Sequence, residues 1–147
     1  MSTSDTIPIE LSIAERHTLT HLLTNYIHTR IWEAVRHAHS SDEMQEAAER
    51  VRRFAQLQNA AWEGSLLRVD LDAHRTDLYI WMMETESTTE EHSARISEVD
   101  DQQHLSRQER DEAIANCRAL IVIDHAHKTV CERIIAQIDA AREAVAS

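Results

Sequence analysis

Residues 106–147, the C-terminal stretch of the chain, contain neither Gly nor Pro. Ser106 and Glu109 begin this stretch at the spacing of a capping box, in which each side chain bonds a free backbone N–H of the first helical turn. Apolar residues then recur at steps of three and four, which places them on one face of a helix. The members of this stripe are Ala113, Cys117, Leu120, Ile123, Val130, Cys131, Ile134, Ile138, Ala141 and Val145.

We therefore predict a single helix that begins near Ser106 and runs to the end of the chain. At about 1.5 Å per residue such a helix is about 60 Å long, more than a compact domain of this size requires. The apolar stripe must be covered by other helices. We expect the tail of the helix to project or to pair with a second chain.

The overall composition agrees with a helical protein. The chain has 147 residues, 42% of them apolar, which suits one domain with a real core. A single Gly and a single Pro leave few turn-forming residues for a sandwich or barrel. The prediction is an all-α fold: a four-helix bundle built from two helical hairpins, with the long helix last.

Gly64 divides the chain into two similar halves. We predict one domain with a loose N-terminus over residues 1–8, a first helical hairpin over 9–63 and a second over 66–147. Each hairpin is entered by a segment in which apolar and polar residues alternate, and two such segments could pair as a short two-stranded β ribbon. The alternating residues are Ile7, Ile9 and Leu11 at the entry to the first hairpin, and Leu67, Val69 and Leu71 at the entry to the second.

Charge and glycine content exclude several functions. The formal net charge of -11 argues against direct nucleic-acid binding, which needs cations against the phosphates. Phosphate-binding loops and nucleophile elbows need several glycines in special conformations, so Walker-type ATPases and Rossmann dehydrogenases are excluded. No catalytic set is recognisable, and we predict a protein that is not an enzyme and uses no cofactor.

Two groups of side chains have the spacing of metal ligands. His17 and His21 lie one helical turn apart, and Asp124, His127 and Cys131 share one face of the long helix. The first pair fits a solvated helix back better, because it lies largely opposite the apolar face of its helix. The second group fits an interhelical hydrogen bond or salt bridge in the core better. No complete ligand set can be assembled, so we predict no bound metal. A bundle that binds a metal or small ligand through His and Asp is retained as an alternative.

The cysteines and the apolar runs indicate in which compartment of the cell the protein is expected. Cys117 and Cys131 would lie about 20 Å apart along one helix, beyond the ~7 Å limit for a disulfide, so both should be free thiols. No basic segment followed by an apolar run marks a signal peptide, and no apolar run is long enough to cross a bilayer. These features favour a cytoplasmic protein without membrane contact.

Six consecutive apolar residues depart from a plain amphipathic pattern, because a helix with such a run is apolar on all sides. They are Leu78, Tyr79, Ile80, Trp81, Met82 and Met83. Tyr79 and Ile80 should point away from the side that Leu78, Trp81 and Met82 share, and Trp81 and Met82 should anchor the interface. We expect this segment to contact a second copy of the chain or another protein. The acidic residues Glu84, Glu86, Glu90 and Glu91 would rim that interface or meet a basic partner.

The resulting hypothesis is a non-catalytic interaction module, a homodimeric regulator or adaptor that also binds another protein. The acidic run leaves a second alternative, an inhibitor that occupies a basic surface of another protein.

Overall fold

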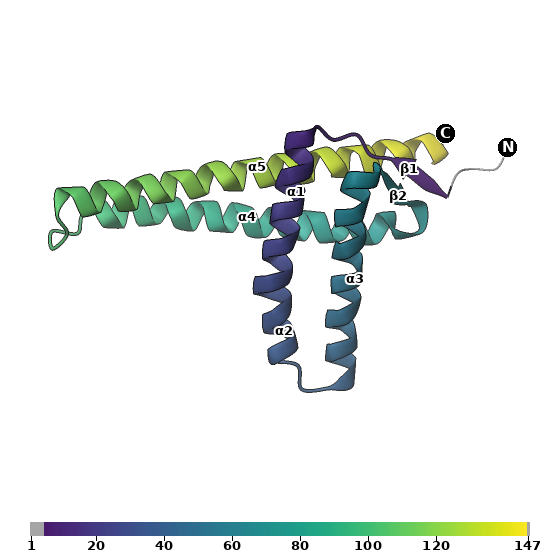
Figure 1. Cartoon of the computed structure of the whole chain (residues 1–147), viewed down its shortest axis with the longest axis horizontal. Coiled ribbons are helices and arrows are strands. Elements are labelled where there is room, and N and C mark those ends of the chain that lie inside the picture. Colours follow the sequence, from purple (N-terminus) through teal and green to yellow (C-terminus); the bar gives the residue numbers. More distant parts are fainter. Residues whose placement is uncertain (1–4, 147) are drawn as a thin grey trace.

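The computed structural model describes residues 5–146, except for the side chains of residues 30, 31, 145 and 146. The first hairpin has two antiparallel halves. One consists of α1 (Ile13–Tyr26), a π-helical turn (Ile27–Ile31) and α2 (Trp32–Arg36), and the other is α3 (Ser41–Glu63). The second hairpin consists of α4 (Leu71–Asp100) and α5 (Arg107–Ala146). The predicted all-α fold with two helical hairpins is confirmed (Figure 1).

Side-chain caps explain where the helices begin. Ser12 Oγ accepts a hydrogen bond from the backbone N–H of Glu15 (3.1 Å), and Glu15 Oε1 accepts one from the N–H of Ser12 (3.0 Å). The predicted capping box is therefore present. Ser106 Oγ likewise accepts from the N–H of Glu109 at 3.1 Å. Gly64, with φ of 80°, ends α3 in the left-handed conformation that a side chain would disfavour.

The predicted ribbon is present as β1 (Thr6–Pro8) paired antiparallel with β2 (Ser65–Leu67). Strand β1 lies within the stretch that the sequence predicts to be loose, and that prediction is wrong for these residues because the pairing orders them. The alternation predicted for the second segment is also wrong, since it is Leu66 that is buried while Leu67 and Val69 are exposed. The reason is that the strand ends early and a 3-10 turn (Arg68–Asp70) leads into α4.

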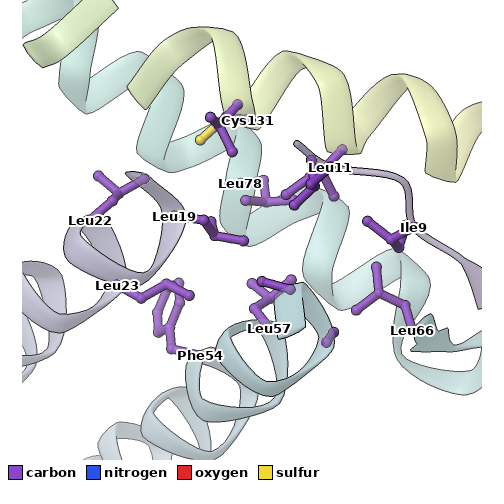
Figure 2. Packing of buried hydrophobic residues seen from close by; sticks show 14 of the residues in the cluster. Ile9, Leu11, Leu19, Leu22, Leu23, Phe54, Leu57, Leu66, Leu78 and Cys131 are labelled. Atoms are coloured by element: carbon purple, nitrogen blue, oxygen red, sulfur yellow. The ribbon is translucent and has the colours of Figure 1, made fainter. Parts of the chain in front are cut away.

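The two hairpins cross each other, and the core lies where they cross (Figure 1). Residues from all four long helices and from the ribbon segments meet there, as Figure 2 shows. Arg53 on α3 donates to Asp77 on α4 at 2.8 Å and 3.3 Å, which ties the hairpins together beside the core. The labelled core residues are Ile9, Leu11, Leu19, Leu22, Leu23, Phe54, Leu57, Leu66, Leu78 and Cys131.

Both hairpins extend beyond the crossing. We call residues 86–129, which comprise the end of α4, the connecting turn and the start of α5, the arm. In Figure 1 the arm extends to the left. Helix α1 lies beside the end of the arm next to the crossing, where the ring of His21 is 6.3 Å from that of His127, and no third helix of the described residues lies beside the outer part of the arm. Among its described side chains only Val99 and Cys117 are buried. No helix in residues 5–146 combines the length and the apolar character needed to cross a membrane.

Two expectations about the long helix are wrong: that its tail projects, and that other helices of the chain cover its whole apolar stripe. Its C-terminal half, with Val130, Ile134 and Ile138, is buried in the core, so it is the first half of the helix that projects and not the tail. Leu120 and Ile123 belong to the same stripe and keep about two fifths of their surface exposed, so the rest of the described chain covers them only in part. The first hairpin crosses α5 steeply and does not run along it, so it covers only part of the length of α5 (Figure 1).

Candidate functional site

The arm presents an apolar surface on α5. Leu120 and Ile123 expose 43% and 42% of their surface, and they continue the stripe that Val130 and Ile134 form in the core. Steps of three, seven and four residues separate these four positions, so they lie on nearly one side of the helix. The stripe is therefore covered by the first hairpin at one end and open at the other. We call Leu120 and Ile123 the arm stripe.

Contacts with the N-terminal segment show how the covered end is held. The backbone N–H of Glu10 donates to Gln137 Oε1 at 2.7 Å, and Gln137 Nε2 donates to the carbonyl of Glu10 at 2.9 Å. Arg133 and Glu15 form an ion pair at 3.3 Å. These contacts lie on the C-terminal half of α5, which leaves the arm stripe outside the first hairpin.

A second apolar surface lies on α4, within the six-residue run. Tyr79, Ile80 and Met83 are exposed and sit on consecutive turns of one face, which we call the α4 patch. Leu78 and Trp81 point the other way into the core of the chain itself, as the helical spacing predicts. Those two side chains are buried and offer no surface to a partner, and Met82 is partly buried against the same core. The run thus divides into a core side and a surface side.

The acidic residues after this run are mostly solvated. Glu86 forms an ion pair with Lys128 of α5 at 2.8 Å, which joins the two helices of the second hairpin. Glu90 and Glu91 are exposed, and Glu84 is half-buried. The exposed carboxylates lie one to three turns beyond the α4 patch, where they could meet a basic surface.

Asp124, His127 and Cys131 do not converge on one point. Asp124 accepts a hydrogen bond from Thr89 Oγ1 at 3.2 Å and lies 3.7 Å from Nε2 of His92, so it makes the interhelical contact that its position favours. Burial lowers the pKa of His127, with Asp124 opposing that shift. Burial raises the pKa of the Cys131 thiol to about 12. Cys131 is thus an inert core residue.

His17 and His21, the histidine pair with the spacing of metal ligands, are both exposed on α1. The ring of His17 packs edge-on against Trp62 at 5.2 Å, and the ring of His21 lies 6.3 Å from that of His127. In the described part of the chain no three or more His, Cys, Asp or Glu side chains are arranged to hold a metal ion.

A pocket of about 240 Å³ lies between β2, the end of α3 and the start of α4. His74 lines it and is only 1% exposed, and its Nδ1 has no hydrogen-bond partner among the described residues. Gln56 lines the same pocket, and its buried Oε1 also lacks a partner there. Both atoms are buried behind the lining, out of reach of a group of water size in the pocket.

Acidic groups dominate the charge of this pocket. Glu63 and Asp70 line it, and no Lys or Arg of the described residues does. Burial lowers the pKa of His74, while Asp70 and Asp77 oppose that shift. His74 is therefore neutral at pH 7.

The patterns in the sequence did not lead to this pocket, although one signal was present. His74 stands three residues after Leu71 and four before Leu78, on the apolar face of α4, where a polar side chain needs a partner. Gln56 carries no such signal. In comparisons with known protein families, curated proteins and solved structures, nothing matches the chain.

Proposed function

We propose that this chain is a non-catalytic protein-interaction module that forms a homodimer through its arm and acts as a regulator or adaptor. The observation that carries the proposal is the open end of the α5 stripe. Leu120 and Ile123 are exposed, although the same stripe is fully covered two to four turns further along the helix. In the proposed dimer, the arm of a second copy of the chain covers Leu120 and Ile123.

A symmetric pair of arms is the simplest arrangement that covers both stripes. In a twofold dimer the same patch faces itself, so one exposed stripe per chain is sufficient. Two antiparallel two-helix arms then form a four-helix bundle, in which apolar residues at three- and four-residue steps pack between the helices. The part of α5 from Arg107 to Ile123 is about 25 Å long at 1.5 Å per residue, which allows several turns of contact.

The α4 patch lies outside the arm and serves a different contact in this proposal. Tyr79, Ile80 and Met83 remain exposed when the arms pair, because they lie on α4 before the arm begins. Aromatic and Met side chains are enriched in protein interfaces. With Glu90 and Glu91 nearby and a net charge of -11, the favoured partner is a protein with a basic rim around an apolar centre.

Light scattering on three variants tests the dimer. We expect the wild type to be a dimer at tens of micromolar and a Leu120→Glu, Ile123→Glu variant to be a folded monomer. Val122→Glu is the matched control, since Val122 is exposed on a different side of the same turn and should leave the dimer intact.

A monomeric wild type refutes the homodimer. A variant with Tyr79→Glu and Ile80→Glu that becomes monomeric, while the Leu120→Glu, Ile123→Glu variant stays dimeric, would move the interface to the α4 patch and refute the assignment to the arm.

A further inference from the structure

We propose that, in the dimer, the turn of each arm binds in a pocket beside His127 of the second copy. The turn comprises residues 101–106, which connect α4 to α5. This inference rests on the proposed homodimer with antiparallel arms, and it adds where each arm ends and which residues meet there.

The pocket lies in the corner between α1, α4 and α5, where the arm meets the crossing, and has a volume of about 240 Å³. His127 lines it and follows Leu120 and Ile123 at steps of three and four residues, so it lies on the same side of α5. Leu22 and Tyr26 of α1 line the side towards the crossing. The pocket therefore lies at the end of the arm stripe, where α1 begins to cover α5.

The length of the arm brings the turn of a second arm to this pocket. The ring of His21 on α1 is 6.3 Å from that of His127, so α1 blocks any helix that lies along the stripe from going further. Between this block and the start of α5 at Arg107 the helix is about 30 Å long, at 1.5 Å per residue. Two equal arms that are antiparallel and in contact over this whole length place the turn of each arm at α1 of the other. The twofold axis then passes near residue 115, midway between the turn and His127.

Hydrogen-bond acceptors predominate on the accessible part of this pocket. Glu84 and Asp124 contribute carboxylates, and both residues are partly exposed. Thr88 donates its hydroxyl hydrogen to the carbonyl of Glu84 at 2.9 Å, so only its oxygen remains for a partner. Asn25 and His127 can donate as well as accept. A partner segment with amide groups, which offer both donors and acceptors, suits this lining.

The turn carries such groups. Gln102 and Gln103 are adjacent and exposed, and each side-chain amide brings two N–H donors and one carbonyl acceptor. These amides can donate to the carboxylates of the pocket and accept from the amide of Asn25. Asp101 is the acidic residue of the turn and opposes the contact, because its charge has the same sign as that of the pocket carboxylates.

Distances between spin labels on the two copies test where the arms end. Ala115 and Ala126 are exposed and eleven residues apart, so labels on cysteines at these positions lie on the same side of α5, off the stripe. The native Cys117 and Cys131 are buried and should not react. In pulsed electron resonance of the two singly labelled variants, the labels at 115 should face each other across the twofold axis, whereas those at 126 should lie about 33 Å apart along the helix axis, at 1.5 Å per residue. In a parallel pair the two separations would be equal.

Substitutions in the turn test the contact itself. Gln102→Glu with Gln103→Glu removes donors and adds like charge against the carboxylates of the pocket, so the dissociation constant of the dimer should rise about tenfold or more. Asp101→Asn removes like charge and should lower the dissociation constant about threefold. Gln45→Glu with Ala48→Glu is the control, because it adds the same charge at exposed positions near the outer end of α3 and should leave the dissociation constant within about twofold of the wild type.

Equal separations at the two label positions overturn this inference and leave the homodimer in place, and so does a Gln102→Glu, Gln103→Glu variant that dimerises as tightly as the control. Labels at residue 126 that lie closer together than those at residue 115 place the two crossings side by side and overturn it too. A wild type that is monomeric at tens of micromolar overturns the homodimer, and this inference with it.

Discussion

Replacing Phe54 by Ala should remove much of the stability of the molecule, because this ring holds the crossing of the hairpins together. Phe54 is 1% exposed and lies 4.9 Å from the ring of Tyr26 and 5.6 Å from that of Trp81. Truncating a buried Phe costs about 3–5 kcal/mol, and the two ring contacts place this site in the upper part of that range. We expect a loss of about 4 kcal/mol from a total that is about 5–15 kcal/mol for a domain.

Urea unfolding measures this loss. With a slope of about 2 kcal/mol per molar urea, the midpoint should fall by about 2 M. Trp81 is buried while Trp32 and Trp62 are exposed, so a red shift of the tryptophan emission reports the opening of the crossing. Protein concentration must be held constant, because the stability of the proposed dimer would depend on it.

Met44→Ala provides the comparison, since Met44 lies on the same helix near its outer end and is 44% exposed. It should cost less than about 1 kcal/mol. If Phe54→Ala lowers the free energy of unfolding no more than Met44→Ala does, the aromatic crossing is not the centre of the core and the reasoning fails.

The buried thiols and histidines give two further predictions. Cys117 and Cys131 are buried free thiols, so both should react with a thiol reagent only as fast as the protein opens; rapid labelling in the native state would contradict this. Burial lowers the pKa of His74 and His127 in the folded state, so below about pH 6.5 the unfolded chain binds more protons than the folded one. The free energy of unfolding should therefore be highest above that pH and fall as the pH drops towards the pKa values of the folded state. A His74→Leu variant should show a shallower fall in urea titrations at several pH values, and an unchanged slope would argue against a buried neutral His74.

The local signals in the sequence were sufficient for the helices and their ends. Ser12 and Ser106 mark helix starts through hydrogen bonds made within one turn, and Gly64 marks a helix end through its own backbone conformation. Such features depend on residues close together in the sequence, so spacing alone predicts them. That two extended segments pair at the hairpin entries could be predicted, although the register and the residues of the second strand could not.

Which part of each helix is covered could not be predicted. Leu120 and Ile134 have equivalent positions in the periodic stripe of α5, yet one is exposed and the other is buried. Periodicity identifies the apolar side of a helix, whereas coverage depends on where a second hairpin crosses it. The same limit applies to residues 78–83, where the pattern separates Tyr79 from Trp81 but does not reveal what lies over Tyr79.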